Sequence, residues 1–164
     1  MLKSLAIGNR GEEFAMSVLK GGDMEAVKNE DKETREYWDL LCKVGRTKFS
    51  CEVKYDVMAQ KTGNIAIEFY NSKSCKDSGI AVTKSDIWVH ILMDDQNMTM
   101  WIASVKEFRK FIKNNKPFRT VNNVGDNNAC LHLYKEDTLL DVVFHRAETL
   151  SEDKLKKLVR KLLK

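Results

Sequence analysis

Short stretches in which apolar and polar residues alternate cover most of the chain and predict β-strands. Such strands are expected at residues 24–29, 36–43, 48–55, 64–70, 86–93, 98–103, 130–134 and 141–145. These stretches are rich in β-branched and aromatic residues, which are typical of strands. The pattern favours a mostly antiparallel sheet.

Three further stretches carry apolar residues at helical spacing. The first covers residues 9–20 and precedes Gly21. The second follows Ser104, which together with Glu107 forms the sequence pattern of a capping box. The third follows Ser151, a residue type favoured at the N-cap. Helices and strands thus alternate unevenly along the chain, as in the α/β (α+β) class.

Composition indicates one folded domain spanning residues 1–164. Hydrophobic residues make up 43% of the chain and charged residues 32%, and no linker or repeat divides it. The net charge of +4 permits a nucleic-acid partner without requiring one. The four cysteines do not have zinc-site spacing. With no apolar leader or long apolar stretch, we expect no membrane contact and a cytoplasmic location.

Two expected strands join at Gly45-Arg46, where glycine first suits a type II′ hairpin turn. Asp39 and Glu52 are equally distant from this turn and should face each other, with Cβ atoms about 4.5–5.5 Å apart. Strand alternation places Lys54 on the same face as Glu52. The apolar residues of both strands fall on the opposite face. One face is therefore expected to be a core layer, and the other to carry Asp39, Glu52 and Lys54.

Two facing carboxylates suit Mg²⁺, which binds one or two carboxylates and keeps several waters. A metal there can polarise a phosphate ester, and Lys54 can stabilise the charge that develops during attack. The same three residue types also occur by chance on the solvated face of an ordinary hairpin. The spacing alone leaves both interpretations open.

The order of these residues resembles the PD-(D/E)XK nuclease superfamily, with Asp39 followed by Glu52-Val53-Lys54 at the end of an apolar strand. Trp38 stands where the superfamily usually has proline. The segment GNRGEEFAMSVLKGG looks like the first helix of archaeal Holliday-junction resolvases, so the resemblance covers residues 8–56 best. It implies a restriction-endonuclease-like core with a central mixed sheet flanked by helices. It also implies an Mg²⁺-dependent DNA endonuclease, for which Mn²⁺ would substitute.

The resemblance implies a further catalytic acid on the first helix, and Glu12 and Glu13 are the candidates. At 100° per residue, Glu12 lies at the edge of the apolar face and Glu13 lies almost opposite it. We therefore expect Glu12 to act with Asp39 and Glu52 as a metal ligand and Glu13 to face water. The alternative is that Glu12 only benefits from the positive end of the helix.

Other candidate residues follow the motif. Ser78, Gly79 and Lys84 lie in a segment that looks like a loop of phage and mobile-element nucleases, and they are expected to contact a DNA backbone. An ordinary surface loop is an equal alternative. Glu68 is more typical of an exposed strand face than of a metal site. The last helix has a basic side that can face either DNA or water, made by Lys154, Lys156, Lys157, Arg160, Lys161 and Lys164.

We therefore expect an endonuclease that hydrolyses phosphodiester bonds. It would be either structure-selective, like a junction resolvase, or site-specific, like enzymes of phages and mobile elements. A phage-encoded enzyme would act in the host cytoplasm. Cutting two strands favours a homodimer. The alternative is a non-catalytic nucleic-acid-binding module that has kept the nuclease fold.

Overall fold

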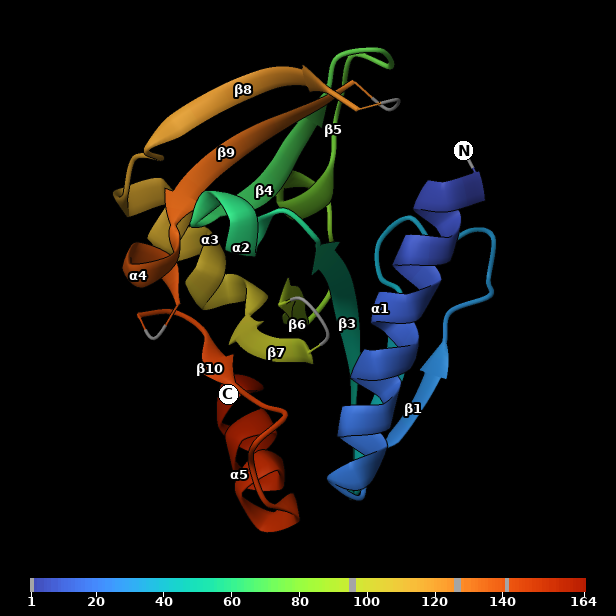
Figure 1. Cartoon of the computed structure of the whole chain (residues 1–164). Helices are drawn as coiled ribbons and strands as arrows, with labels where there is room; N and C mark the ends of the chain where they lie inside the picture. The colour runs from blue at the N-terminus through green and yellow to red at the C-terminus, as the bar shows by residue number, and fades with distance from the viewer. Residues whose placement is uncertain (1, 95–96, 126–127, 141) are drawn as a thin grey trace.

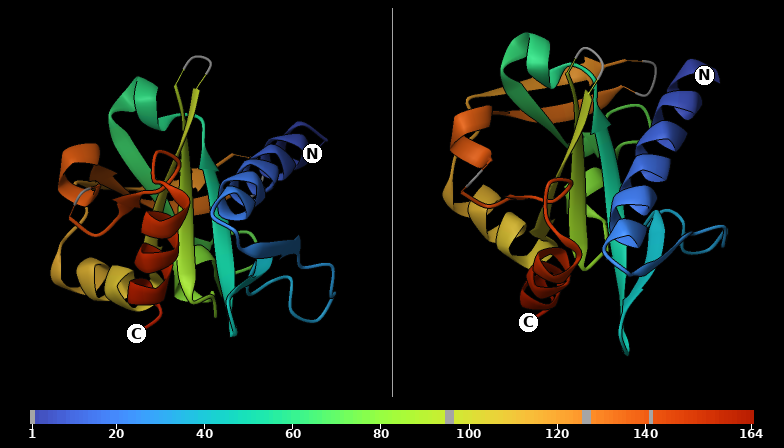
Figure 2. Two further views of the ribbon diagram at one scale, coloured as in Figure 1. Left: turned by 90° about the horizontal axis from the view of Figure 1, so that it is seen from below. Right: turned by 60° about the horizontal axis from the view of Figure 1, so that its bottom comes forward.

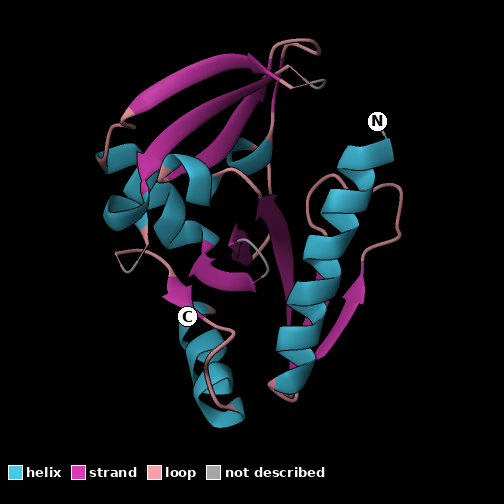
Figure 3. Cartoon of the chain, viewed as in Figure 1, coloured by secondary structure: helices cyan, strands magenta, loops and turns pink. Residues whose placement is uncertain are grey.

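A computed structural model describes residues 2–94, 97–125, 128–140 and 142–164 of the chain. It has a six-stranded sheet, a separate four-stranded sheet and helices packed against the larger one (Figure 1, Figure 3). The protein thus combines helices and strands as the sequence predicts. No helix in the described ranges is long and apolar enough to cross a membrane.

The chain begins with a helix and three antiparallel strands, which are α1 (Leu2–Gly21), β1 (Glu25–Lys28), β2 (Leu40–Val44) and β3 (Thr47–Asp56). At the β2–β3 turn, Gly45 has a φ of +62° and Arg46 has no positive φ, as a type II′ turn requires. Leu40 pairs with Cys51. The register predicted from the turn is therefore confirmed.

After β3 the chain leaves the large sheet and later returns to it. The excursion comprises α2 (Ala59–Thr62), β4 (Asn64–Asn71), β5 (Lys76–Asp77) and the 3-10 helix η1 (Gly79–Ala81). The chain then adds β6 (Ile87–Asp94), β7 (Asn97–Ser104) and, much later, β10 (His145–Arg146), giving the order β1-β2-β3-β6-β7-β10. β6 runs parallel to β3, whereas β7 is antiparallel to β6. The large sheet is therefore mixed.

The remaining elements are α3 (Val105–Asn114), β8 (Arg119–Val124), β9 (Ala129–Lys135), α4 (Glu136–Leu139) and α5 (Glu152–Leu162). β8 and β9 join β4 and β5 in an antiparallel sheet of order β5-β4-β9-β8. The strand expected at 64–70 thus belongs to a second sheet, and the sequence pattern did not reveal β8.

Each face of the large sheet has its own apolar core. On one face, α1 and α5 pack on alternate strand residues such as Cys51, Val53 and Val89. On the other, α3 and the small sheet cover Trp88 and Leu92. The two views of Figure 2 show the large sheet between these layers. β6 is consequently buried on both faces, which matches its nearly uninterrupted apolar sequence.

The strand expected at 36–43 begins only at Leu40. The reason is the carbonyl of Tyr37, which accepts hydrogen bonds from the Thr83 hydroxyl and the Lys84 N–H instead of joining the ladder. Asp39 still donates its N–H to the Cys51 carbonyl. The chain thus enters the sheet at the residue predicted to carry the chemistry.

Three other expectations hold only in part. Ser104 and Ser151 occupy the N-cap positions of α3 and α5, as the sequence predicts, but neither side chain makes a cap hydrogen bond. The expected strand at 141–145 is reduced to β10, which begins at His145. Asp141 lies outside the described residues. The first helix begins seven residues before the predicted start, at Leu2.

Candidate active site

Asp39, Glu52 and Lys54 lie on the face of the large sheet that carries Trp88, opposite α1. Lys54 Nζ is 2.7 Å from Glu52 Oε1 and 5.8 Å from the centre of the Trp88 ring. The Glu52 side chain is 9% exposed, whereas that of Lys54 is 33% exposed. The carboxylate is therefore held inside the protein, and the ammonium partly reaches solvent.

Asp39 lies in the bend directly before β2 and interacts with Glu52 of β3. The Val53 N–H donates a hydrogen bond of 2.7 Å to Asp39 Oδ2, which fixes the carboxylate against β3. Burial and, after it, the negative charge of Glu52 together raise the pKa of Asp39 to about 6, against the opposing effects of Lys54 and the Val53 N–H. The two carboxylates are therefore close enough to act on each other, as the register predicts.

Lys54 provides the positive charge next to these two carboxyl groups. Burial alone would lower its pKa, but the charges of Glu52 and Asp39 and the hydrogen bond with Glu52 outweigh burial, so the pKa of Lys54 is raised above 10.5. The Glu68 carboxylate acts in the same direction. Lys54 is therefore positively charged at neutral pH. Glu68, which the sequence left outside the site, contributes to its electrostatics.

The segment that follows η1 also lies beside Glu52. The Thr83 hydroxyl lies 2.8 Å from the Tyr37 carbonyl and 3.4 Å from Glu52 Oε2. Arg109 on α3 donates to the carbonyls of Ile80 and Thr83, at 2.9 Å and 2.6 Å from Nη2. Sequence reasoning missed Thr83 and Arg109, because neither belongs to a recognisable motif. The only signal in the sequence was that Thr83 directly precedes Lys84, a predicted DNA contact.

The three expected DNA contacts lie in this same segment. Gly79 has a φ of +53°, and a Cβ there would come 2.3 Å from the Glu68 carbonyl oxygen, so only glycine fits. Lys84 is exposed, with Nζ 3.6 Å from the centre of the Tyr37 ring. The Ser78 hydroxyl oxygen is buried and finds no hydrogen-bond partner in the described part of the chain. Lys84 is thus the one of the three whose side chain faces solvent.

Glu12 lies on α1, which packs against the opposite face of the sheet. Its carboxylate pairs with Lys28 of β1 at 3.1 Å, and its side chain is 24% exposed. Glu13 is exposed, as predicted. Across the described ranges, no three His, Cys, Asp or Glu side chains converge as a metal-binding group. The structure therefore brings Asp39, Glu52 and Lys54 together but does not add Glu12 to them.

Asp39 and Glu52 nevertheless offer suitable donors for a hard cation. Mg²⁺ typically binds through one or two carboxylates and completes its shell with water and substrate oxygens. The negative charge of Glu52 contributes to the raised pKa of Asp39. A cation bound between the two carboxylates would relieve this repulsion. The donor set thus fits Mg²⁺ or Mn²⁺ with two protein ligands.

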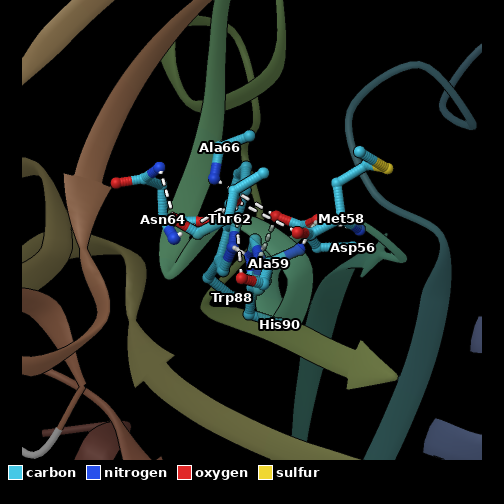
Figure 4. A network of polar contacts seen from close by, with 8 residues as sticks. All are labelled: Asp56, Met58, Ala59, Thr62, Asn64, Ala66, Trp88 and His90. Atoms are coloured by element: carbon cyan, nitrogen blue, oxygen red, sulfur yellow. Dashed lines mark hydrogen bonds and ion pairs between the residues drawn. The ribbon is translucent and has the colours of Figure 1, made fainter. Parts of the chain in front are cut away.

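A second polar network adjoins the site on β3 and β6. Asp56 accepts hydrogen bonds from the N–H groups of Met58, Ala59 and Ala66 (Figure 4). The Trp88 indole N–H donates to His90 Nδ1 at 3.3 Å, and His90 Nε2 lies 3.6 Å from Asp56 Oδ2. His90 is the β6 partner of Lys54. This network connects β3, α2, β4 and β6 behind the candidate site.

Asp56 is charged in this network. Burial opposes its ionisation, but the contact with His90 and the backbone N–H groups outweigh burial, so the pKa of Asp56 is lowered. Sequence reasoning saw no role for the histidines. The structure gives His90 a supporting position, because its side chain is 1% exposed and does not reach the surface.

Comparisons of the chain with protein-family models, curated proteins and solved structures found no match.

Proposed function

We propose that the protein is an Mg²⁺-dependent DNA endonuclease with a restriction-endonuclease-like core. The observation that carries the proposal is the cluster of Asp39, Glu52 and Lys54, in which two carboxylates interact with each other and Lys54 forms an ion pair with Glu52. The mixed sheet with helices on both faces agrees in outline with the nuclease resemblance.

Asp39 and Glu52 would hold the metal, which when bound polarises the phosphate and lowers the pKa of a water. Lys54 carries a positive charge beside both carboxylates and is one-third exposed. It would stabilise the negative charge that develops on the phosphate oxygens. Thr83 would hold the segment before Asp39 in place, because its hydroxyl donates to the Tyr37 carbonyl beside Glu52.

The place of Glu12 in the catalytic set comes from the resemblance and stays a prediction. Its ion pair with Lys28 gives it a structural role that needs no metal. A Glu12→Gln variant separates the two roles, because a catalytic acid is required for cleavage even when the protein remains folded. Glu13→Gln, one residue away on the exposed side of α1, is the matched control.

The substrate class in this proposal is DNA, either branched or carrying a specific site. Ser78, Gly79 and Lys84 border the segment that supports Glu52, so the proposal retains them as backbone contacts. A homodimer would place one site on each strand. The protein would act in the cytoplasm of the cell that makes it.

A non-catalytic DNA-binding module remains the second candidate. It is favoured by one observation, that only two acids converge among the side chains the structure describes. The direct ion pair between Lys54 and Glu52 also keeps Glu52 satisfied without a metal.

The two candidates differ in DNA cleavage. The wild-type protein is incubated with supercoiled plasmid and with a synthetic four-way junction, in Mg²⁺, in Mn²⁺ and in EDTA, and binding is measured in parallel. The nuclease proposal expects cleavage of at least one substrate with metal and none with EDTA. Binding without cleavage in either metal would support the non-catalytic module instead.

A further inference from the structure

A groove with basic walls lies between α3 and α5, at the end of the large sheet where the C-terminus is seen in both views of Figure 2. Its main hollow has a volume of about 480 Å³, and a second hollow of about 270 Å³ adjoins it. The two hollows share part of their lining, namely Ser104, Lys106, Leu162 and Lys164. They therefore form one continuous depression.

Four exposed lysines line this depression and define what we call the basic groove: Lys106, Lys110, Lys161 and Lys164. Two acids also lie along it. Glu107 pairs with Lys110 at 3.7 Å, and Asp86 accepts hydrogen bonds from the N–H and hydroxyl of Ser50. Lysines thus outnumber acids, and three of them, Lys106, Lys161 and Lys164, form no ion pair with an acid among the described residues, whereas Lys110 pairs with Glu107.

The basic groove reaches the candidate active site through Arg109. This residue lines the second hollow, and its guanidinium binds the carbonyls of Ile80 and Thr83. Thr83 in turn lies beside Glu52. Two consecutive contacts, from Arg109 to Thr83 and from Thr83 to Glu52, therefore connect the lining of the groove to the candidate active site.

The basic residues of the last helix fall into different surroundings in the structure. Lys156 pairs with Asp23 and with Glu152, each at 2.7 Å, so its charge is neutralised within the fold. Lys161 and Lys164 instead join the lysines of α3 across the groove. The sequence showed six basic residues on one helix, but only these two combine with basic residues of another element in this way.

We propose that the basic groove binds the sugar–phosphate backbone of the DNA that is held at Asp39, Glu52 and Lys54. This inference rests on the proposed nuclease function and extends it, because it names the surface that holds the flanking backbone. Lysines suit this task, since each acts as a mobile point charge toward a phosphate and reads no base sequence. Apolar side chains, Phe111 and Leu162 among them, line the main hollow together with the lysines.

Backbone contacts of this kind have a quantitative signature. Each phosphate that a lysine neutralises adds about 0.9 to the slope of the logarithm of affinity against the logarithm of salt concentration for duplex DNA. Removing four contacting lysines should lower this slope by about 2–4 and weaken binding at least about tenfold at low salt. The loss should be similar for different DNA sequences.

The test uses the full-length protein and a fluorescent DNA duplex in EDTA, where binding is measured without cleavage. Wild type is compared with a variant in which Lys106, Lys110, Lys161 and Lys164 are all changed to alanine. The matched control changes four other exposed lysines, Lys20, Lys32, Lys61 and Lys73, to alanine. Circular dichroism and thermal unfolding establish that both variants remain folded.

The proposal expects the groove variant to bind DNA more weakly and with a smaller dependence of affinity on salt concentration. The control variant should keep most of the affinity and most of its salt dependence. Equal losses in the two variants would show that only overall charge matters, and would overturn the groove. Wild type that binds no duplex would overturn it as well. Wild type that binds through the groove but cuts no DNA in Mg²⁺ would support the groove and reject the nuclease function, so the two failures are distinguishable.

Discussion

Asp39, in the bend before β2, lies near Glu52 of the neighbouring strand β3, and burial together with the charge of Glu52 raises the pKa of Asp39 to about 6. Lys54 is held 2.7 Å from the Glu52 carboxylate on the same face. Without a metal, the protein therefore holds two carboxyl groups and one positively charged lysine close together in a partly buried site. Such an arrangement costs stability unless a cation completes it.

Asp39→Asn should stabilise the metal-free protein by about 1–2 kcal/mol at neutral pH. The folded-state pKa of about 6 lies above the ordinary value of 3.8, so the charged form of Asp39 destabilises the fold above pH 6. This penalty fades as the pH falls from about 6 to 3.8, because the carboxyl is then protonated in the folded state. Urea unfolding in EDTA, at neutral pH and near pH 4, measures both effects.

Glu13→Gln removes a charge from an exposed position and is the control for Asp39→Asn. It should change stability by less than about 0.5 kcal/mol. A loss of several kcal/mol in Asp39→Asn at neutral pH would show that the two carboxylates do not repel each other.

Metal affinity should rise with pH until Asp39 is ionised. Because a ligating carboxyl must lose its proton, affinity should increase up to about tenfold per pH unit below pH 6 and level off above it. Titration calorimetry with Mn²⁺ between pH 5 and 8 measures this. Asp39→Asn should weaken binding and remove the change near pH 6. Equal affinity of the wild type at pH 5 and pH 7 would argue against Asp39 as a ligand.

Lys54→Met should destabilise the protein by about 1–3 kcal/mol, because it leaves the buried Glu52 carboxylate without its ion-pair partner. The double variant Glu52→Gln/Lys54→Met should regain most of that loss, since it has no unpaired charge at this position. Neither variant should cut DNA. A double variant no more stable than Lys54→Met would mean that the ion pair contributes little to the fold.

Thr83→Val should slow cleavage about tenfold while leaving DNA affinity unchanged, because it removes the hydroxyl that holds the Tyr37 carbonyl, two residues before Asp39, but keeps the side-chain volume. Thr83→Ser should retain most of the activity, since it keeps the hydroxyl. Single-turnover rates at saturating DNA separate the positioning effect from binding. Equal slowing in the valine and serine variants would point to packing rather than to the hydrogen bond.

Asp56→Asn should lower stability by about 1–3 kcal/mol at neutral pH, because the buried carboxylate accepts three backbone N–H bonds and contacts His90. The lowered pKa of Asp56 means that its ionisation stabilises the fold above pH 3.8 and that this contribution is lost on further acidification. Denaturation of wild type and variant at neutral pH and below pH 4 measures the difference. Asp137→Asn, at an exposed acid, is the control.

The site could be predicted from sequence where local rules determine it. Gly45 fixes the hairpin turn, the turn fixes the register up to Leu40 and Cys51, and Asp39 follows directly outside this ladder, near Glu52. The same alternation correctly sent Cys42 and Cys51 into the core. No long-range information is needed for any of these steps.

The rest of the site depends on contacts between distant segments. Thr83 and Arg109 reach Glu52 and the η1 segment only because β6 returns beside β3 in parallel, which local periodicity does not reveal. The helical rotation of 100° per residue correctly placed Glu12 at the edge of the buried face of α1. It could not show that this face packs on the side of the sheet away from Lys54.

The most direct test of the proposed site is the single-turnover rate of DNA cleavage in Mg²⁺ at saturating protein, for wild type, Asp39→Ala, Lys54→Ala and the control Glu13→Gln. The structure predicts that wild type and Glu13→Gln cut at similar rates. Asp39→Ala and Lys54→Ala should be slower by about a hundredfold or more. Undiminished cleavage by folded Asp39→Ala and Lys54→Ala proteins would contradict the assignment of the active site to this hairpin.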